Sequence, residues 1–221
     1  IYHNPASTKP ANTSHKSAIT TDGGTTKLST PNSADFAFGT GDFTIELWAR
    51  RHDSDTCGLI QMFSDANNRW QLSHYGSLSW YSNVGGSSID NAAAHGADTN
   101  WHHYAVVGDD SANTLTVYRD GTLSSQTTSF TQNMSVSAGT IYFGTRTDNG
   151  SDFTTYSANL DMNMIRIVKG TAVYTGNFAA PTALTATGGT YSSTTNVVTS
   201  ITAGHTKVLI NSDVGNSGAY G

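Results

Sequence analysis

The sequence has little charge and almost none of the residues that usually cover exposed helices. Only 12% of its 221 residues are charged, against roughly 25% in an average globular domain. It contains a single Glu, Glu46, and five Lys. Short hydroxyl side chains suit strand edges and turns, whereas long charged ones suit helix surfaces. Because the chain has 26 Ser and 33 Thr, we expect helix to be a minor component.

Other missing features exclude whole classes of partner. With a net charge of −5 and 11 basic residues, the chain lacks the clustered Lys and Arg that nucleic-acid binding requires. No apolar run in the sequence approaches the ~20 residues of a membrane-spanning helix. Cys57 is the only cysteine, so there is no internal disulfide framework. We therefore expect neither a nucleic-acid nor a membrane partner.

Alternating apolar residues predict short strands along most of the chain. In the first strand, at 43–49, Phe43, Ile45 and Leu47 share one face. Further strands are expected at 58–63, 69–74, 78–82, 101–107, 114–119, 140–144, 160–168 and 206–210. An Asp-Gly pair at 120–121 is the strongest hairpin signal. Since strands do not alternate with helices, the pattern predicts an all-β, antiparallel two-sheet sandwich of the jelly-roll type.

Several segments, in order, carry a family resemblance. They are 34–48 (ADFAFGTGDFTIELW), 100–107 (NWHHYAVV), 114–121 (TLTVYRDG), 140–144 (TIYFG) and 160–168. Over roughly residues 20–185 the chain resembles the laminin-G-like, concanavalin-A-like lectin jelly-roll superfamily. The strand that usually reads I-D-E-V-R-I in that family has Asn163 and Met164 in place of its acidic pair. The resemblance thus implies the fold, while any ion-holding role of that pair is in doubt.

A narrower resemblance lies in residues 166–182 (RIVKGTAVYTGNFAAPT), which are similar to domains of marine phage structural proteins and bacterial surface proteins. It implies a virion-surface or extracellular location, with other virion proteins or copies of this chain as partners. We expect an extended N-terminal arm at 1–27, a laminin-G-like sandwich at 28–185 and a C-terminal edge strand or linker at 186–221.

Two functions from different classes fit these features. The first is a non-catalytic virion structural or display protein, such as a decoration, fibre or tail-associated domain, which also binds host glycans weakly. The second is a carbohydrate-binding or adhesin module of a secreted bacterial protein.

The residues needed for catalysis do not occur in a suitable pattern. Glycoside hydrolysis normally needs two carboxyl groups, and hydrolases of this fold carry two glutamates on one strand, whereas Glu46 stands alone. No G-x-S-x-G nucleophile motif is present. His102 and His103 are consecutive, so on a regular strand they face opposite sides and do not share an ion. We expect the chain not to be an enzyme.

The candidate carbohydrate-binding residues are aromatic side chains on neighbouring strands and loops. Sugar sites combine aromatic platforms with short polar groups. The candidates are Trp70, Tyr75, Trp80, Tyr81 and Tyr156. Trp70 and Trp80 fit the core equally well, because alternation turns half of all strand residues inward.

Calcium is the one cofactor that the sequence suggests. Asp148, Asn149 and Asp152 surround a glycine turn and offer the oxygen ligands that calcium prefers. A second polar cluster lies at 109–113. Both segments fit equally well a solvated turn in which Asp and Asn side chains cap their own backbone.

Overall fold

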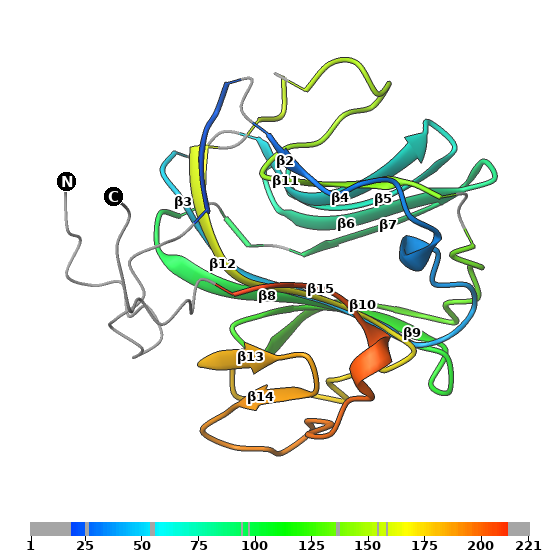
Figure 1. The fold of residues 1–221 in the computed structure, drawn as a ribbon, viewed down its shortest axis with the longest axis vertical. Coiled ribbons are helices and arrows are strands. Elements are labelled where there is room, and N and C mark those ends of the chain that lie inside the picture. The colour runs from blue at the N-terminus through cyan, green and yellow to red at the C-terminus, as the bar shows by residue number, and fades with distance from the viewer. Residues whose placement is uncertain are drawn as a thin grey trace.

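The structure is a computed structural model that describes residues 19–24, 27–53, 56–93, 95–96, 98–135, 138–153, 155–157 and 159–211. Within these residues the chain forms two antiparallel sheets packed face to face, with a small hairpin outside the larger sheet (Figure 1). The predicted all-β sandwich is confirmed. The helices in this part of the chain are two 3₁₀ turns, η1 (Ala34–Phe36) and η2 (Ala203–His205). No helix in the described ranges has the length and apolar character needed to cross a membrane.

The larger sheet, as far as the chain is described, has seven strands. In spatial order they are β1 (Ile19–Asp22), β12 (Asn159–Lys169), β3 (Phe43–Arg51), β8 (Trp101–Asp109), β9 (Thr114–Arg119) and β10 (Thr122–Thr128), with β15 (Thr206–Ile210) also paired to β12. β1 pairs with the first part of β12 and β15 with the last part. Strands from opposite ends of the chain therefore complete the same edge of the sheet.

A bulge divides β12 between these two partners. The pairing of β12 with β3 shifts between Asn163 and Arg166, and Met164 adopts a φ of +49°. The Asn163 side-chain oxygen accepts a hydrogen bond from the Met164 amide at 2.7 Å. The residues that replace the family's acidic pair thus stabilise a local backbone distortion.

The smaller sheet has six strands among the described residues. They are β2 (Leu28–Ser29), β11 (Thr140–Phe143), β4 (Cys57–Asp65), β5 (Asn68–His74), β6 (Leu78–Val84) and β7 (Ser87–Ala93). Every strand predicted from the sequence is present, and the additional strands are β1, β2, β7 and β10 in the two sheets and the hairpin strands β13 and β14. Of these, β7 and β10 lie at sheet edges and are rich in polar residues.

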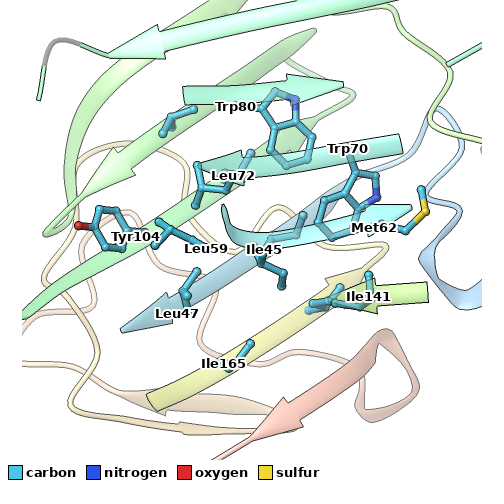
Figure 2. Close-up of a cluster of buried hydrophobic side chains, with 14 of the residues drawn as sticks. Ile45, Leu47, Leu59, Met62, Trp70, Leu72, Trp80, Tyr104, Ile141 and Ile165 are labelled. Carbon is cyan, nitrogen blue, oxygen red and sulfur yellow. The ribbon is translucent and has the colours of Figure 1, made fainter. Parts of the chain in front are cut away.

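The main core fills the space between the two sheets. Figure 2 shows Trp70 and Trp80 of the smaller sheet beside Leu72, with Ile45 and Leu47 of the larger sheet facing them. The two indole rings stack with centroids 5.5 Å apart. Burial of these large apolar side chains is the main contribution to the stability of the sandwich.

A third layer covers the outer face of the larger sheet. Residues 170–205 lie there and include the hairpin of β13 (Ala183–Thr185) and β14 (Gly188–Thr190) (Figure 1). A second apolar cluster forms beneath this layer, from Val107 and Tyr118 on the sheet to Val173 and Phe178 in the covering segment. The boundary expected between the sandwich (28–185) and the C-terminal segment (186–221) falls between β13 and β14. Residues 1–18, 25 and 26 of the expected arm lie outside the described residues.

Candidate functional site

The outer face of the smaller sheet carries two aligned rows of side chains. Because side chains alternate along β5, β6 and β7, the neighbours of the core residues Trp70 and Trp80 point outward. One row, here called the tall row, consists of Gln71, Tyr81 and Asp90. The adjacent row, the low row, consists of Ser73, Ser79 and Ala92. The small side chains of the low row leave the sheet surface hollowed beside the tall row.

The loop after β11 forms a wall along this hollow. Gly58 of β4 lets the loop lie directly on the strand, because a Cβ atom there would be 2.5 Å from the carbonyl carbon of Thr145. The buried Gln61 side chain holds the loop in place. The Thr147 amide donates to Gln61 Oε1 at 2.7 Å, and Gln61 Nε2 donates to the Thr147 carbonyl at 2.8 Å. Gln61 Nε2 also donates to Gln71 Oε1 at 2.9 Å, which joins the loop to the tall row.

The sheet and the loop together enclose a hollow of about 360 Å³, near the lower end of the roughly 300–1,000 Å³ typical of small-molecule pockets. Its lining is polar apart from aromatic rings and one alanine. The lining residues are Arg69, Gln71, Ser73, Tyr75, Ser77, Ser79, Tyr81, Asp90, Ala92, Arg146 and Asp148.

Arg69 is held at one end of the hollow by its neighbours. Its Nη1 donates to the Asp148 carbonyl at 2.8 Å and lies 3.2 Å from the Asp148 carboxylate. The guanidinium carbon is 5.3 Å from the centre of the Tyr81 ring, within the range of a cation–π contact. Arg69 and Tyr81 therefore keep each other in place.

Arg146, in the wall loop, lies between two other tyrosines. Its guanidinium carbon is 3.8 Å from the Tyr156 ring centre and 5.8 Å from that of Tyr75. Its nearest carboxylate oxygen, on Asp148, is 4.0 Å away, which is beyond hydrogen-bond range. Tyr75 is 64% exposed. The hollow thus combines exposed aromatic surface and hydroxyl groups with a cation, Arg146, whose Nε has no hydrogen-bond partner among the described residues.

The sequence comparison gives the family. The Concanavalin A-like lectin/glucanases superfamily matches residues 22–166, which is most of the chain. The chain belongs to this superfamily. No curated protein matches it.

Solved structures of lectin-like domains share the fold of this superfamily member. Domains LG4-5 of the mouse laminin alpha1 chain match with a TM-score of 0.51 and 15% identity, over 67% of this chain and 40% of that one. The CBM40 of the Ruminococcus gnavus IT-sialidase, solved bound to alpha2,3 sialyllactose, matches with a TM-score of 0.51 and 12% identity, over 66% of this chain and 89% of that one. This superfamily member therefore has a lectin-like fold.

Two of the aromatic residues predicted to bind sugar are in the core of this lectin-like domain. Trp70 and Trp80 are both 0% exposed and stack on each other between the sheets. A ligand on the surface does not reach them, so this part of the prediction is wrong. Tyr75 and Tyr81 line the hollow, and Tyr156 supports Arg146 beside it. Sugar binding by these three tyrosines stays a prediction.

The loop predicted to bind calcium forms a hydrogen-bonded turn. Asn149 Oδ1 accepts from the backbone amides of Ser151 and Asp152, each at 2.9 Å. Asp152 Oδ2 accepts from the Thr155 hydroxyl at 2.7 Å, and the Asp148 carboxylate pairs with Arg69. These are the contacts of a capped turn, and they fit poorly to an ion that needs the same oxygens. The calcium site stays a prediction. Calorimetric titration of the chain with calcium tests it, and a titration without heat would refute it.

The second candidate cluster, at 109–113, is also a capped turn. Asp109 Oδ1 accepts from the Ser111 hydroxyl at 2.7 Å and from the Ala112 amide at 2.9 Å. Asn113 takes the left-handed conformation, with a φ of +52°. In the described part of the chain, no group of three or more His, Cys, Asp or Glu side chains is placed to hold a metal ion.

Glu46 is buried on the other side of the molecule, beneath the third layer. It accepts from Arg166 Nε at 2.7 Å, from the Tyr174 hydroxyl at 2.6 Å and from His103 Nε2 at 3.1 Å. Burial alone would raise the pKa of Glu46, but Arg166 and His103 outweigh it and lower the pKa to about 2. Glu46 is thus a permanently charged structural group and not a proton donor.

The consecutive histidines have separate partners, as alternation predicts. His103 is buried and bonds to Glu46, whereas His102 lies between Asp98 and Asp120, with nitrogen–oxygen distances of 2.8 and 2.6 Å. Burial alone would lower the pKa of His102, but its hydrogen bonds to Asp120 and Asp98 raise it above the usual value. Both histidines are therefore part of ion-paired clusters that hold strands together.

Several residues of the hollow were not identified from the sequence. They are Arg69, Gln71, Ser73, Ser77, Ser79, Asp90, Ala92 and Arg146. The residues on β5 could have been found from the sequence, because Arg69, Gln71 and Ser73 alternate with Trp70 and Leu72 and so form a polar outer face. No sequence pattern indicates Arg146, since its position depends on how the wall loop packs on Gly58.

Proposed function

We propose that this chain is a glycan-binding module and that the hollow on the smaller sheet is its sugar site. The observation that supports this most is the combination of Tyr75 and Tyr81 with the low row of Ser73, Ser79 and Ala92 in one hollow. A sugar ring has an apolar face that packs on an aromatic ring and hydroxyl groups that bond to short polar side chains. The hollow offers both within one small volume.

The groups around the hollow match what a sugar needs. The Ser79 hydroxyl donates to Asp90 Oδ1 at 2.9 Å, which fixes the Asp90 carboxylate as an acceptor for sugar hydroxyls. Gln71 uses its carbonyl oxygen for Gln61, so its amide group is left as a donor on the hollow side. The sialyllactose-bound CBM40, which shares this fold, lends further support.

We propose that the module binds without catalysis. Hydrolysis requires a carboxylic acid to protonate the leaving group and a second carboxylate opposite it. In the hollow, Asp148 is held by Arg69 and Asp90 by Ser79. Both carboxylates are arranged as hydrogen-bond acceptors, which suits binding.

Display on a virion or a cell surface, and contact with other virion proteins or further copies of the chain, stay predictions from the sequence. Glycan binding is compatible with either setting. The genes beside this one test the setting directly, because capsid or tail genes would favour the virion and genes for secreted enzymes would favour the bacterial module.

The sugar site is tested by filling the hollow. Ala92 is exposed on the low row, so Ala92→Leu occupies the space without removing a hydrogen bond. On a glycan array, we expect the wild-type chain to bind a set of sugars and the variant to lose about tenfold or more in affinity, equivalent to about 1.4 kcal/mol.

The matched control is Thr128→Leu, which adds a leucine at an exposed strand position on β10, in the other sheet. This variant should bind like the wild type. If Ala92→Leu bound sugars as tightly as the wild type, the sugar site would lie elsewhere. If the wild type bound no glycan on the array, the proposed function would be refuted.

A further inference from the structure

Arg146 has donors that no described group of the protein accepts. Its side chain is only 12% exposed, and a guanidinium carries five N–H donors. The structure gives it ring contacts with Tyr156 and Tyr75 and one carboxylate, Asp148, at 4.0 Å. Its Nε is buried and has no hydrogen-bond partner in the described part of the chain. A desolvated cation in this position is unfavourable unless an acceptor reaches it.

The protein's own acceptors near Arg146 are already in use. Asp148 is 3.2 Å from Arg69 Nη1, and its carbonyl accepts from the same atom. Asp90 accepts from Ser79 and stands on β7, two strands away from Arg69 on β5. Among the described residues, Arg69 and Arg146 therefore share one nearby carboxylate, Asp148, and the part of the hollow beside the wall loop carries more positive than negative charge.

The position of Arg146 is imposed by the fold and not by a flexible side chain. The backbone on both sides of it is fixed, since Thr145 packs on Gly58 and Thr147 bonds twice to Gln61. The Tyr156 ring then supports the face of the guanidinium. A planar guanidinium with a fixed orientation is suited to a ligand with two acceptor oxygens on one group.

We infer that the sugar bound in the hollow is acidic and that an oxygen of its anionic group accepts hydrogen bonds from Arg146. This inference rests on the proposed function and specifies its ligand. The anionic group is a sugar carboxylate or a sulfate ester, since both present paired oxygens to a guanidinium. The ring and its hydroxyls lie on the low row, towards Asp90, and the anionic end lies towards the wall loop.

The inference is tested with sugars that share a lactose unit and differ in whether they carry an acidic group. Isothermal titration compares lactose with alpha2,3 sialyllactose, which carries a carboxylate, and with lactose 6-sulfate, which carries a sulfate. We expect at least one acidic sugar to bind the wild-type chain about tenfold or more tighter than lactose, and this advantage to shrink as salt screens the charge. The two acidic sugars together identify whether the group is a carboxylate or a sulfate.

Arg146→Gln should abolish the preference for the acidic sugar, because the affinity for the acidic sugar should fall by a much larger factor than the affinity for lactose, which has no anionic group to lose its partner. Arg146→Lys keeps the charge but not the planar donor pair, and should retain part of the preference. The matched control is Arg50→Gln. Arg50 also lies over an aromatic ring, with its guanidinium carbon 5.5 Å from the Trp101 ring centre, but is paired with Asp161 on the other sheet.

Three results would overturn the inference. Equal binding of lactose and both acidic sugars would do so, and so would an equal loss of neutral and acidic sugars in Arg146→Gln, which would make Arg146 structural. In both cases Ala92→Leu still blocks lactose and the proposed function stands. If no sugar binds, both proposals fail. Circular dichroism shows whether Arg146→Gln is folded. If it is not, the inference is judged by whether Arg146→Lys retains part of the preference for the acidic sugar and whether salt reduces that preference in the wild type.

Discussion

At the scale of single residues, the chain's one glutamate is placed where a charge is most costly. Glu46 is fully buried and its carboxylate is surrounded by Arg166, His103 and Tyr174. Arg166 is also fully buried and donates further to the carbonyls of Thr185 and Gly188 in the β13–β14 hairpin. The charged pair therefore connects two strands of the larger sheet to the layer that covers it.

We expect Glu46→Gln to lower the free energy of unfolding by roughly 3–5 kcal/mol, because it leaves the Arg166 guanidinium buried without its counter-charge. Urea denaturation followed by tryptophan fluorescence measures the loss. Removing both charges, as in Glu46→Gln with Arg166→Met, should cost less than the sum of the two single changes. Additive losses would show that the two side chains do not stabilise each other.

The sequence distinguished some of the site residues from core residues and not others. Trp70 shares its strand face with Leu72, and Arg69, Gln71 and Ser73 share the opposite one. That alternation predicts a buried Trp70, so the sequence of the strand alone is enough to assign this tryptophan to the core. Tyr156 and Arg146 lie in a loop that has no periodicity. Their contact depends on tertiary packing, and no local pattern predicts it.

At the scale of elements, alternation identified the strands that bury one face. β3 and β5 show it clearly, because alternate side chains of each strand point into the core between the sheets, although the other face of β3 is buried too, beneath the third layer. β7 and β10 were missed because they are edge strands with mostly Ser, Thr, Asp and Asn side chains. Polar edges discourage pairing with other chains, so the feature that hides these strands from sequence patterns also suits them to the edge.

Gly58 determines where the wall loop lies on β4. A Cβ atom at this position would be within 2.7 Å of three backbone atoms of the loop. We expect Gly58→Ala to push the loop away from the strand, to lower the free energy of unfolding by roughly 1–3 kcal/mol through overpacking, and to weaken glycan binding because Arg146 moves with the loop. Urea denaturation measures the loss of stability, and isothermal titration with the acidic sugar that the wild type binds measures the loss of affinity.

Gly204→Ala is the control for this change. Gly204 has no atom within 4 Å of an added Cβ and no left-handed backbone angle, so alanine there should affect neither stability nor binding. If Gly58→Ala kept wild-type affinity, the hollow would not depend on the position of the wall loop.

At the scale of the whole molecule, the titratable side chains have pKa values that are shifted by different amounts. As the pH falls, their contributions to stability are therefore lost at different pH values. Burial lowers the pKa of His74 to about 3, and the neighbouring cations Arg51 and Arg119 act in the same direction. The pKa of His95 is lowered too, chiefly by burial. Glu46 and Asp98 both have pKa values of about 2, because burial is outweighed by Arg166 and His103 at Glu46 and by the Asn100 amide, His102 and Arg119 at Asp98. His102, with its raised pKa, opposes this trend.

These shifts predict that stability begins to fall near pH 6.5 and not only near pH 4. The unfolded chain protonates His74 at about its usual pKa of 6.5, whereas the folded chain does not until about pH 3. Stability from neutral His74 is therefore complete above pH 6.5 and declines as pH falls, by up to about 1.4 kcal/mol per pH unit. Lost carboxylate pairs add to the decline below about pH 4. Urea denaturation between pH 7.5 and 4.5 measures it, and His74→Leu should flatten the upper part of the curve. If His74→Leu left the slope of the wild-type curve between pH 6.5 and 5 unchanged, the assignment of His74 as a neutral core residue would be wrong.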